Sequence, residues 1–516
     1  MTGKKFTSTV AGASILITAV GLIGKGLGLI REIVFANFFG LNTQFDLYLV
    51  GAVLPITINT VILYLGQNYF IPSYNKTKIE TPEKTRAFTN SSFWIFSLFG
   101  LLLAAILFYL SGPIVNLYLH DSSSFEFIST LNVFRIFLLT IPLSAAYSIL
   151  AAFLQSEFEF RSPAMSQLLL NVAVILLVVI FSNKIGVYTI PIGYIAGNLL
   201  QLIFLLFKAA NKIKLNLYMF IKGGNARAII NYSLVITILI ESISQIYLLA
   251  DRYFFNEVQK GGIASLNYAS YIYLLPITII SAALSTAIFP SFSLSLHSNI
   301  IEDVQKKLDN FFSINLFLFV PISLTLIFYG GIIIRILFQR GEFNSGATQM
   351  TFEVLKYYAV SLIFYSSYAV INKLLYGANL VKILLVITVT GCFIKIAANF
   401  YLVKDLQQNG LAISTSISYL FFFIAGIGVV LIKLKLKVKY FLKEFSLDII
   451  NGFVSYLLAV VLIPESLFPN TFTNGFLKLL IFCASYIFNA KLIRQDVFKL
   501  FENAFVNIPL FKNNKI

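Results

Sequence analysis

The stretch LPITI at residues 54–58 is repeated without change at residues 275–279, an offset of 221 residues. At the same offset Arg31 corresponds to Arg252, and Gly40 corresponds to Gly261. Agreement of an arginine, a glycine and a proline-containing segment without a gap indicates an internal repeat. The repeated unit is a basic helix end, a glycine turn and a second helix that contains proline.

Long apolar stretches surround both copies of this repeat. A membrane-spanning helix needs roughly 20 mostly apolar residues. The first stretch is long and has no small-residue cleavage site, so we expect a spanning helix rather than a signal peptide. Fourteen stretches meet the length requirement: 10–37, 44–72, 90–117, 126–154, 162–182, 186–207, 228–255, 263–294, 310–337, 348–377, 380–403, 409–432, 446–463 and 474–492.

The composition excludes a soluble enzyme. Hydrophobic residues make up 58% of the chain and charged residues 12%, whereas a soluble domain carries about 25% charged residues. No segment between the apolar stretches is long enough for a catalytic domain or a nucleic-acid-binding domain. Cys392 and Cys483 lie in apolar runs, and His120 and His297 are far apart, so neither a disulfide framework nor a metal site is expected. Transport is therefore the expected activity.

The basic residues predict the orientation, because short cytoplasmic loops retain Lys and Arg. One set of alternate loops and the two termini hold 25 Lys and Arg residues, and the other set holds 6. Both termini are therefore expected in the cytoplasm.

The repeat predicts how the helices are grouped. Six stretches separate the starts of the two copies, so both copies run in the same direction. We expect an all-α polytopic membrane protein with two parallel six-helix lobes, at 1–210 and 211–440, and two further helices with a cytoplasmic tail at 441–516. Pro55 and Pro276 each remove a backbone donor and should kink their helices. Alternatively, they are ordinary prolines, which are frequent in spanning helices.

Charged residues inside the bilayer are costly and usually face a water-filled cavity. Lys25 and Arg31 lie on the first predicted helix, Asp46 opens the second and Arg252 closes the seventh. These residues are expected to form a cationic chamber for an anionic head group, because guanidinium groups bind phosphate oxygens in bidentate fashion. Alternatively, the arginines extend to the outer interface. Gly28, with glycines 21, 24 and 26, should let the first helix bend or pack closely.

Other embedded charges allow further hypotheses. Glu241, with Gln245 one turn later, could bind a coupling cation or a proton, or could serve a structural hydrogen bond. Glu353 and Lys356 are three residues apart and should form an ion pair. The lysines at 433, 435, 437 and 439 suggest either a strip that attracts anionic lipid or a simple positive-inside anchor.

Two stretches carry a family resemblance. The first runs from GLIREIV at residues 28–34 through Gly40 and Asp46 to Pro55, and the second is ILFQRGEF at 336–343 followed by LYGA at 375–378. The sequence is similar to the MurJ (MviN) lipid II flippases of the multidrug/oligosaccharidyl-lipid/polysaccharide exporter superfamily. The similarity extends over most of the chain.

The resemblance implies two lobes around a cationic cavity, alternating access, and a groove for the lipid tail formed with the last two helices. It assigns functional importance to Lys25, Arg31 and Asp46, with Lys25 standing where arginine is usual. Two further family arginines fall near Asn59/Thr60 and Tyr271, where this chain has none. Arg252 is a candidate to compensate for the second.

The leading hypothesis is a flippase, not an enzyme, in the bacterial inner membrane. It would move an undecaprenyl-diphosphate-linked saccharide, with lipid II the first candidate. No cofactor is expected, and membrane potential, Na⁺ or H⁺ are the candidate driving forces. A monomer surrounded by membrane lipids is expected, with association with the cell-wall synthesis machinery left open. The alternatives are an O-antigen, capsule or teichoic-precursor flippase, a cation-coupled multidrug antiporter, and a membrane scaffold that transports nothing.

Overall fold

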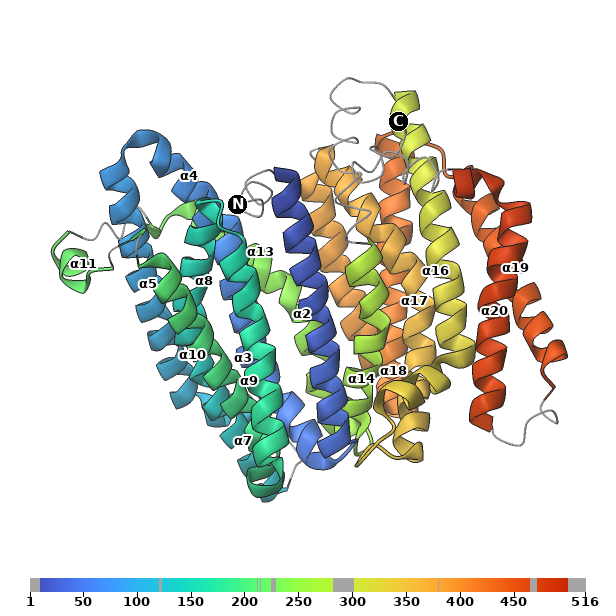
Figure 1. Ribbon diagram of the computed structural model, residues 1–516, viewed down its shortest axis with the longest axis horizontal. Coiled ribbons are helices and arrows are strands. Elements are labelled where there is room, and N and C mark those ends of the chain that lie inside the picture. The colour runs from blue at the N-terminus through green and yellow to red at the C-terminus, as the bar shows by residue number, and fades with distance from the viewer. Residues whose placement is uncertain are drawn as a thin grey trace, which may run out of the picture. The chain divides into compact units, whose positions relative to one another are not determined.

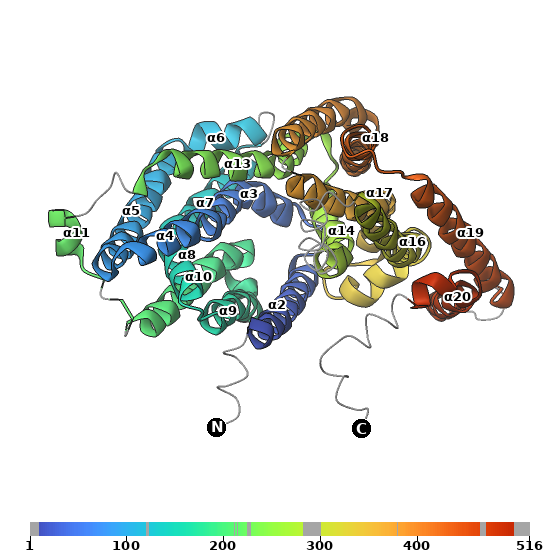
Figure 2. The ribbon, with the colours of Figure 1, turned by 90° about the horizontal axis from the view of Figure 1, so that it is seen from above.

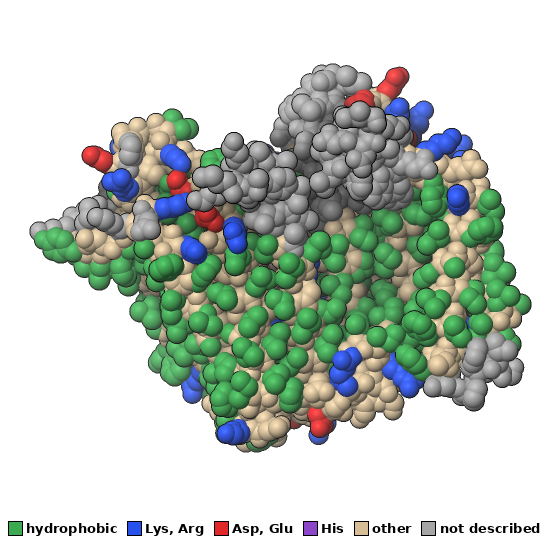
Figure 3. Space-filling view, viewed as in Figure 1, with side chains coloured by type: hydrophobic (Ala, Val, Ile, Leu, Met, Phe, Trp, Pro, Cys, Tyr) green, Lys and Arg blue, Asp and Glu red, His purple; other side chains and the backbone are tan. Residues whose placement is uncertain are grey.

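Apolar sequence of this density forms helices because a bilayer offers no partners to unpaired backbone groups. The computed structural model describes residues 10–119, 123–210, 212–213, 215–223, 229–281, 301–378, 380–464 and 471–499, and within these ranges all regular structure is helical (Figure 1). His120 and His297 lie outside the described residues. On the face drawn in Figure 3, hydrophobic side chains cover the helix flanks and most charged side chains lie near helix ends.

The chain divides into two compact units, each of which is a helical bundle. The first comprises Met1–Ala264 and Arg340–Asn344. Its helices are α2 (Val10–Phe39), α3 (Thr43–Leu65), η1 (Gly66–Phe70), α4 (Ile71–Glu80), α5 (Pro82–Tyr109), α6 (Ser111–Tyr118), α7 (Ser124–Leu138), α8 (Thr140–Ser156), α9 (Arg161–Ile185), η2 (Gly186–Tyr188), α10 (Thr189–Ala209), α11 (Leu217–Gly223), α13 (Tyr232–Leu249) and η3 (Ala250–Glu257).

The second unit comprises Ser265–Gln339 and Ser345–Ile516. It contains most of α14 (Gly262–Pro276), then η4 (Ile277–Ser281), α16 (Ile301–Phe338), α17 (Ser345–Gly377), α18 (Val381–Lys433), α19 (Lys439–Leu462) and α20 (Thr471–Ile493). Helix α13, which the sequence assigned to the second lobe, packs on α3 within the first unit. The lobe boundaries predicted at 210 and 440 stay a prediction.

A helix occupies each of the fourteen predicted stretches. Ten helical segments of the described chain are long and apolar enough to cross a membrane. Two of these segments, Arg161–Ala209 and Val381–Lys433, each correspond to two of the predicted stretches. Gly186, with φ +59° and ψ −139°, separates α9 from α10, and Gln407, with φ +49° and ψ −130°, divides α18 into two helices. Helices α2 and α13 occupy the two remaining stretches.

The described contacts of the glycines in α2 are not close, which leaves bending as the remaining alternative of the prediction. A Cβ atom at Gly26 or Gly28 would meet nothing within 4 Å, and one at Gly24 would lie 3.7 Å from Leu168. The helix continues without a break through Gly28. The packing of α2 against α3 instead depends on aromatic rings, since Phe35 meets Phe45 and Tyr48 edge-on at centroid distances of 6.0 and 6.3 Å. A hinge role for Gly28 stays a prediction.

The two prolines of the repeat lie at different positions in their helices. Pro55 is buried inside α3, which continues as an α-helix to Leu65. Pro276 ends α14, and the chain continues directly as the π-helix η4. Such a change of helix type is a common place for a spanning helix to bend.

Three glycine turns meet in the first unit. Gly40, Gly261 and Gly341 all have positive φ angles, of +51°, +81° and +53°. A Cβ atom at Gly261 would lie 2.6 Å from the carbonyl oxygen of Leu41, and one at Gly341 would overlap the carbonyl oxygen of Asn37. Asn37 also accepts a 3.0 Å hydrogen bond from the backbone N–H of Glu342. The repeat glycines and the glycine of the ILFQRGEF stretch thus belong to one turn cluster.

Candidate functional site: charged groups among the helices of the first unit

Arg31 lies between three helices of the first unit. Its guanidinium donates to Glu32 Oε1 from Nη2 at 2.8 Å and from Nε at 3.1 Å, and to Asn171 of α9 at 3.2 Å. The guanidinium carbon also lies 5.6 Å from the ring centroid of Tyr194 on α10, a cation–π distance. Helices α2, α9 and α10 lie side by side in Figure 2. Arg31 is 9% exposed and Glu32 2%, so this ion pair is buried.

Lys25 is half-buried and lies six residues before Arg31 on the same helix. Six residues of an α-helix correspond to a rotation that leaves the two side chains about 120° apart. The two predicted cations therefore leave α2 on different faces.

The carboxylate of Asp46 is bound to backbone N–H groups and does not face an open cavity. Its carboxylate accepts the backbone N–H groups of Gly261 at 2.6 Å and of Ala264 at 2.7 Å, and the residue is 1% exposed. Carboxylates stabilise helix N-termini in this way, because the first N–H groups of a helix have no partner within it. Arg252 of η3 is near enough for its charge to act on Asp46. Asp46 therefore lies at the N-terminus of α14, and the role of Asp46 and Arg252 in substrate binding stays a prediction.

Of the two candidate coupling residues on α13, Glu241 contacts η1. Glu241 Oε1 accepts a 2.8 Å hydrogen bond from Asn68 Nδ2. Gln245, one turn later, is 8% exposed. The hydrogen bond of Glu241 fits a structural role as well as a cation site, and ion coupling stays a prediction. The predicted pair of Glu353 and Lys356 is confirmed at 2.6 Å.

The positions without the family arginines hold neutral polar groups. Asn59 Nδ2 donates to Thr140 Oγ1 at 2.7 Å, which joins α3 to α8. Thr60 donates to the carbonyl oxygen of Ile56 in its own helix. Tyr271 is half-buried on α14. Asn59 and Thr60 therefore add no cation to the first unit.

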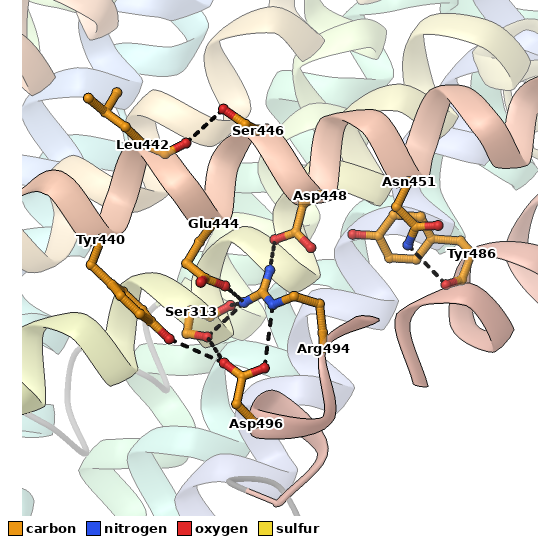
Figure 4. Close-up of polar contacts among 10 residues, drawn as sticks. All are labelled: Ser313, Tyr440, Leu442, Glu444, Ser446, Asp448, Asn451, Tyr486, Arg494 and Asp496. Atoms are coloured by element: carbon orange, nitrogen blue, oxygen red, sulfur yellow. Dashed lines mark hydrogen bonds and ion pairs between the residues drawn. The ribbon is translucent and has the colours of Figure 1, made fainter. Parts of the chain in front are cut away.

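A buried charge cluster in the second unit was not predicted (Figure 4). Arg494 is 2% exposed; it forms ion pairs with Glu444 and, at 2.6 Å, with Asp448, both on α19. It also donates to Ser313 Oγ of α16 at 2.7 Å, and its Nε lies 3.7 Å from Asp496. We call these five residues the Arg494 cluster. It joins α16, α19 and the end of α20.

Arg494 follows the last predicted stretch, 474–492, and is therefore one of the 25 basic residues expected on the cytoplasmic side. The available signal was the spacing of Glu444 and Asp448, which are four residues apart and therefore on one face of a helix. Asn171 and Tyr194 gave no such signal, because nothing in the sequence shows which polar groups of α9 and α10 face Arg31.

The fold defines the class of protein. It aligns with a solved inward-facing multidrug-resistance MATE family transporter of the MOP superfamily at a TM-score of 0.68 and 14% identity, covering 82% of this chain and 98% of that one. The chain therefore has the polytopic all-helical fold that this MATE structure also has.

The family is narrower than the fold. The profile of the family described as "Lipid II flippase MurJ" matches residues 35–483, so the chain belongs to that family. It is a family of transporters rather than enzymes.

Individual relatives are similar over most of their length. A protein of Thermosipho africanus named "Lipid II flippase MurJ" is 27% identical over 457 residues, covering 86% of this chain and 90% of that one. A "Probable lipid II flippase MurJ" of Buchnera aphidicola subsp. Acyrthosiphon pisum is 27% identical over 415 residues, covering 78% and 80%. The solved "Lipid II flippase MurJ, inward closed conformation" aligns at a TM-score of 0.79 and 23% identity, covering 94% of this chain and 100% of that one.

Proposed function

We propose that this protein moves lipid II from the cytoplasmic to the outer leaflet of the bacterial inner membrane by alternating access. The observation that carries the proposal is the family match over residues 35–483, which includes both copies of the LPITI segment and the three glycine turns and begins near the end of α2. The charges held among the helices of the first unit suit a diphosphate. The lipid-linked substrate would remain partly in the bilayer throughout.

Arg31 is the residue we assign to the diphosphate. In this structure two nitrogens of the Arg31 guanidinium donate to Glu32, so phosphate binding would replace Glu32 with phosphate oxygens as the acceptor. Lys25 and Arg252 would add positive charge. Only Arg252 could also bind phosphate in bidentate fashion, because the ammonium group of lysine is a point charge. The exchange of one anion for another keeps the guanidinium paired at every stage, which limits its desolvation cost.

Coupling to an ion or to membrane potential belongs to the same proposal. Glu241 would bind Na⁺ or a proton through its carboxylate, which now accepts a hydrogen bond from the amide nitrogen of Asn68. No organic cofactor is needed for such a cycle. Both termini would lie in the cytoplasm, as the basic residues indicate.

The test is complementation with the full chain. Expressed in a strain depleted of its own lipid II flippase, the wild-type protein should restore growth and cell shape. Purified protein in proteoliposomes should also expose a labelled lipid II to the outer medium. Flipping of an undecaprenyl-diphosphate-linked O-antigen unit, without lipid II flipping, would instead assign the chain to polysaccharide precursor export. If the protein flips neither lipid II nor the O-antigen unit in these assays, the result contradicts transport of this substrate class.

A further inference from the structure

A cavity of about 680 Å³ lies at the start of α19 in the second unit. It is bounded by the first turns of α16 on one side and by the segment between α18 and α19 on the other. Its lining combines lysines, polar groups and one exposed leucine: Gln305, Asp309, Lys437, Lys439, Tyr440, Leu442, Lys443 and Ser446. We call it the basic pocket.

One side chain holds the wall of the basic pocket in place. Gln305 accepts the backbone N–H of Lys437 at 2.7 Å and donates to the backbone carbonyl of the same residue at 2.9 Å. Its amide also donates to Asp309 at 2.9 Å. A single amide thus satisfies both backbone groups of a linker residue, and the linker is fixed against α16 rather than free in solvent.

The basic pocket has an excess of positive charge. Lys439 and Lys443 are four residues apart and share one face of α19. In the described chain Lys437, Lys439 and Lys443 form no ion pair, and Asp309 is the one carboxylate of the lining. Val438 provides no side-chain cap, so the first N–H groups of α19 add the positive end of a helix dipole. Lysines and a helix N-terminus together favour a phosphate.

The apolar part of the basic pocket indicates where the phosphate comes from. Leu442 is 61% exposed, and α19 continues from it as an apolar helix long enough to cross a membrane. A soluble anion would leave this surface in water, whereas a phospholipid covers it with its acyl chains. We propose that the basic pocket binds the head-group phosphate of an anionic phospholipid, independently of the transported substrate.

Binding here would act on the contact between α19 and α16. Tyr440 lines the basic pocket and donates from its hydroxyl to Asp496 at 3.2 Å, and Asp496 is part of the Arg494 cluster (Figure 4). A head group beside Tyr440 therefore lies one side chain away from Arg494, which pairs with Glu444 and Asp448 of α19 and donates to Ser313 of α16. The bound lipid should stabilise this junction.

The experiment measures lipid binding by native mass spectrometry of the purified full-length protein. The probes are dioleoyl phosphatidylglycerol, dioleoyl phosphatidylcholine and inorganic phosphate. The wild type should retain phosphatidylglycerol in preference to phosphatidylcholine. Lys439→Gln with Lys443→Gln should reduce that retention by about fivefold for each lysine, and Lys439→Arg with Lys443→Arg should restore it.

The matched control is Lys433→Gln with Lys435→Gln. These two lysines belong to the same strip and are exposed, but they do not line the basic pocket. An equal loss in the control pair would show a diffuse positive surface and overturn the proposal. Equal retention of both lipids, or displacement of phosphatidylglycerol by millimolar inorganic phosphate, would also overturn it. A fluorophore on Leu442→Cys, in a protein with Cys392→Ser and Cys483→Ser and all lysines intact, gives a second readout and should shift only with the anionic lipid.

Discussion

Asp46 Oδ2 accepts a 2.6 Å hydrogen bond from the backbone N–H of Gly261, a residue 215 positions later in the chain. Its second oxygen accepts the N–H of Ala264, the last residue of the first unit before the chain passes into the second. The carboxylate thus holds the second-copy glycine turn against the helix that follows the first-copy turn. The two halves of the repeat are joined by a charge-assisted backbone contact.

Replacing Asp46 should destabilise the protein more than losing an ordinary helix cap. Asp46→Ala leaves two buried N–H groups without acceptors, at about 1–3 kcal/mol for each. Asp46→Asn keeps one acceptor and should lose less. Thermal unfolding of the purified protein measures both changes. Asn42→Ala is the control, because Asn42 caps α3 through one 2.8 Å hydrogen bond and should cost about 1 kcal/mol. An equal cost for Asn42→Ala and Asp46→Ala would contradict this assignment.

The Arg31–Glu32 pair allows structural and functional roles to be separated. Glu32→Gln leaves a buried guanidinium without its counter-charge and should cost about 3–5 kcal/mol. Arg31→Leu combined with Glu32→Leu removes both charges and should keep the unfolding temperature near that of the wild type. Arg31→Ala and the double variant should both fail to complement the flippase-depleted strain. Full growth with the stable double variant would exclude Arg31 from substrate binding.

Glycine substitutions should separate the turn cluster from helix α2. Gly341→Ala combines a positive φ with overlap onto Asn37, so we expect a loss of more than about 2 kcal/mol. Gly28→Ala is the matched control, since its Cβ would lie in open space and alanine favours the helix by about 1 kcal/mol. The measurement is the unfolding temperature of each variant. If Gly28 is also a hinge, its alanine variant will be stable yet slower in lipid flipping.

The Arg494 cluster should dominate the attachment of α19 to α16. Arg494→Ala leaves Glu444 and Asp448 buried without a cation, and such losses cost about 3–5 kcal/mol. Asp496→Asn should cost less than about 1 kcal/mol, because Asp496 is half-exposed and 3.7 Å from Arg494. Protease accessibility of the segment after α20, together with thermal unfolding, checks this order. Similar losses in both variants would show that burial does not set the strength of these pairs.

Coupling through Glu241 predicts a specific kinetic change. Glu241→Gln preserves the hydrogen bond with Asn68 but removes the charge, so any dependence of flipping on Na⁺ or on a proton gradient should disappear. Asn68→Ala removes the hydrogen bond and retains the charge, and should leave the ion dependence in place. If the Glu241→Gln variant flips lipid with the same ion dependence as the wild type, Glu241 has only a structural role. The readout is lipid flipping in proteoliposomes under imposed gradients.

The helices and their number follow from the sequence alone. Apolar stretches of spanning length must form helices in a bilayer wherever they occur, so each of the fourteen predicted stretches contains one. The repeat at residues 54–58 and 275–279 and its glycine turns at Gly40 and Gly261 were also predictable, since glycine adopts such φ angles without strain, whereas the turn at Gly341 was not predicted. Family membership follows from the same local patterns.

The partners of the charged side chains were decided by the tertiary structure. Arg31 has neighbours from α9 and α10 that lie far away in sequence, and Asp46 binds backbone groups, which carry no side-chain signal. Arg494 reads as one more positive-inside residue, yet it is buried against Glu444, Asp448 and Ser313. Hydrophobicity is a property of each segment by itself, whereas the pairing of a buried charge depends on which helices pack together. For this protein the sequence therefore determined what spans the membrane, and the packing decided what each charge inside it contacts.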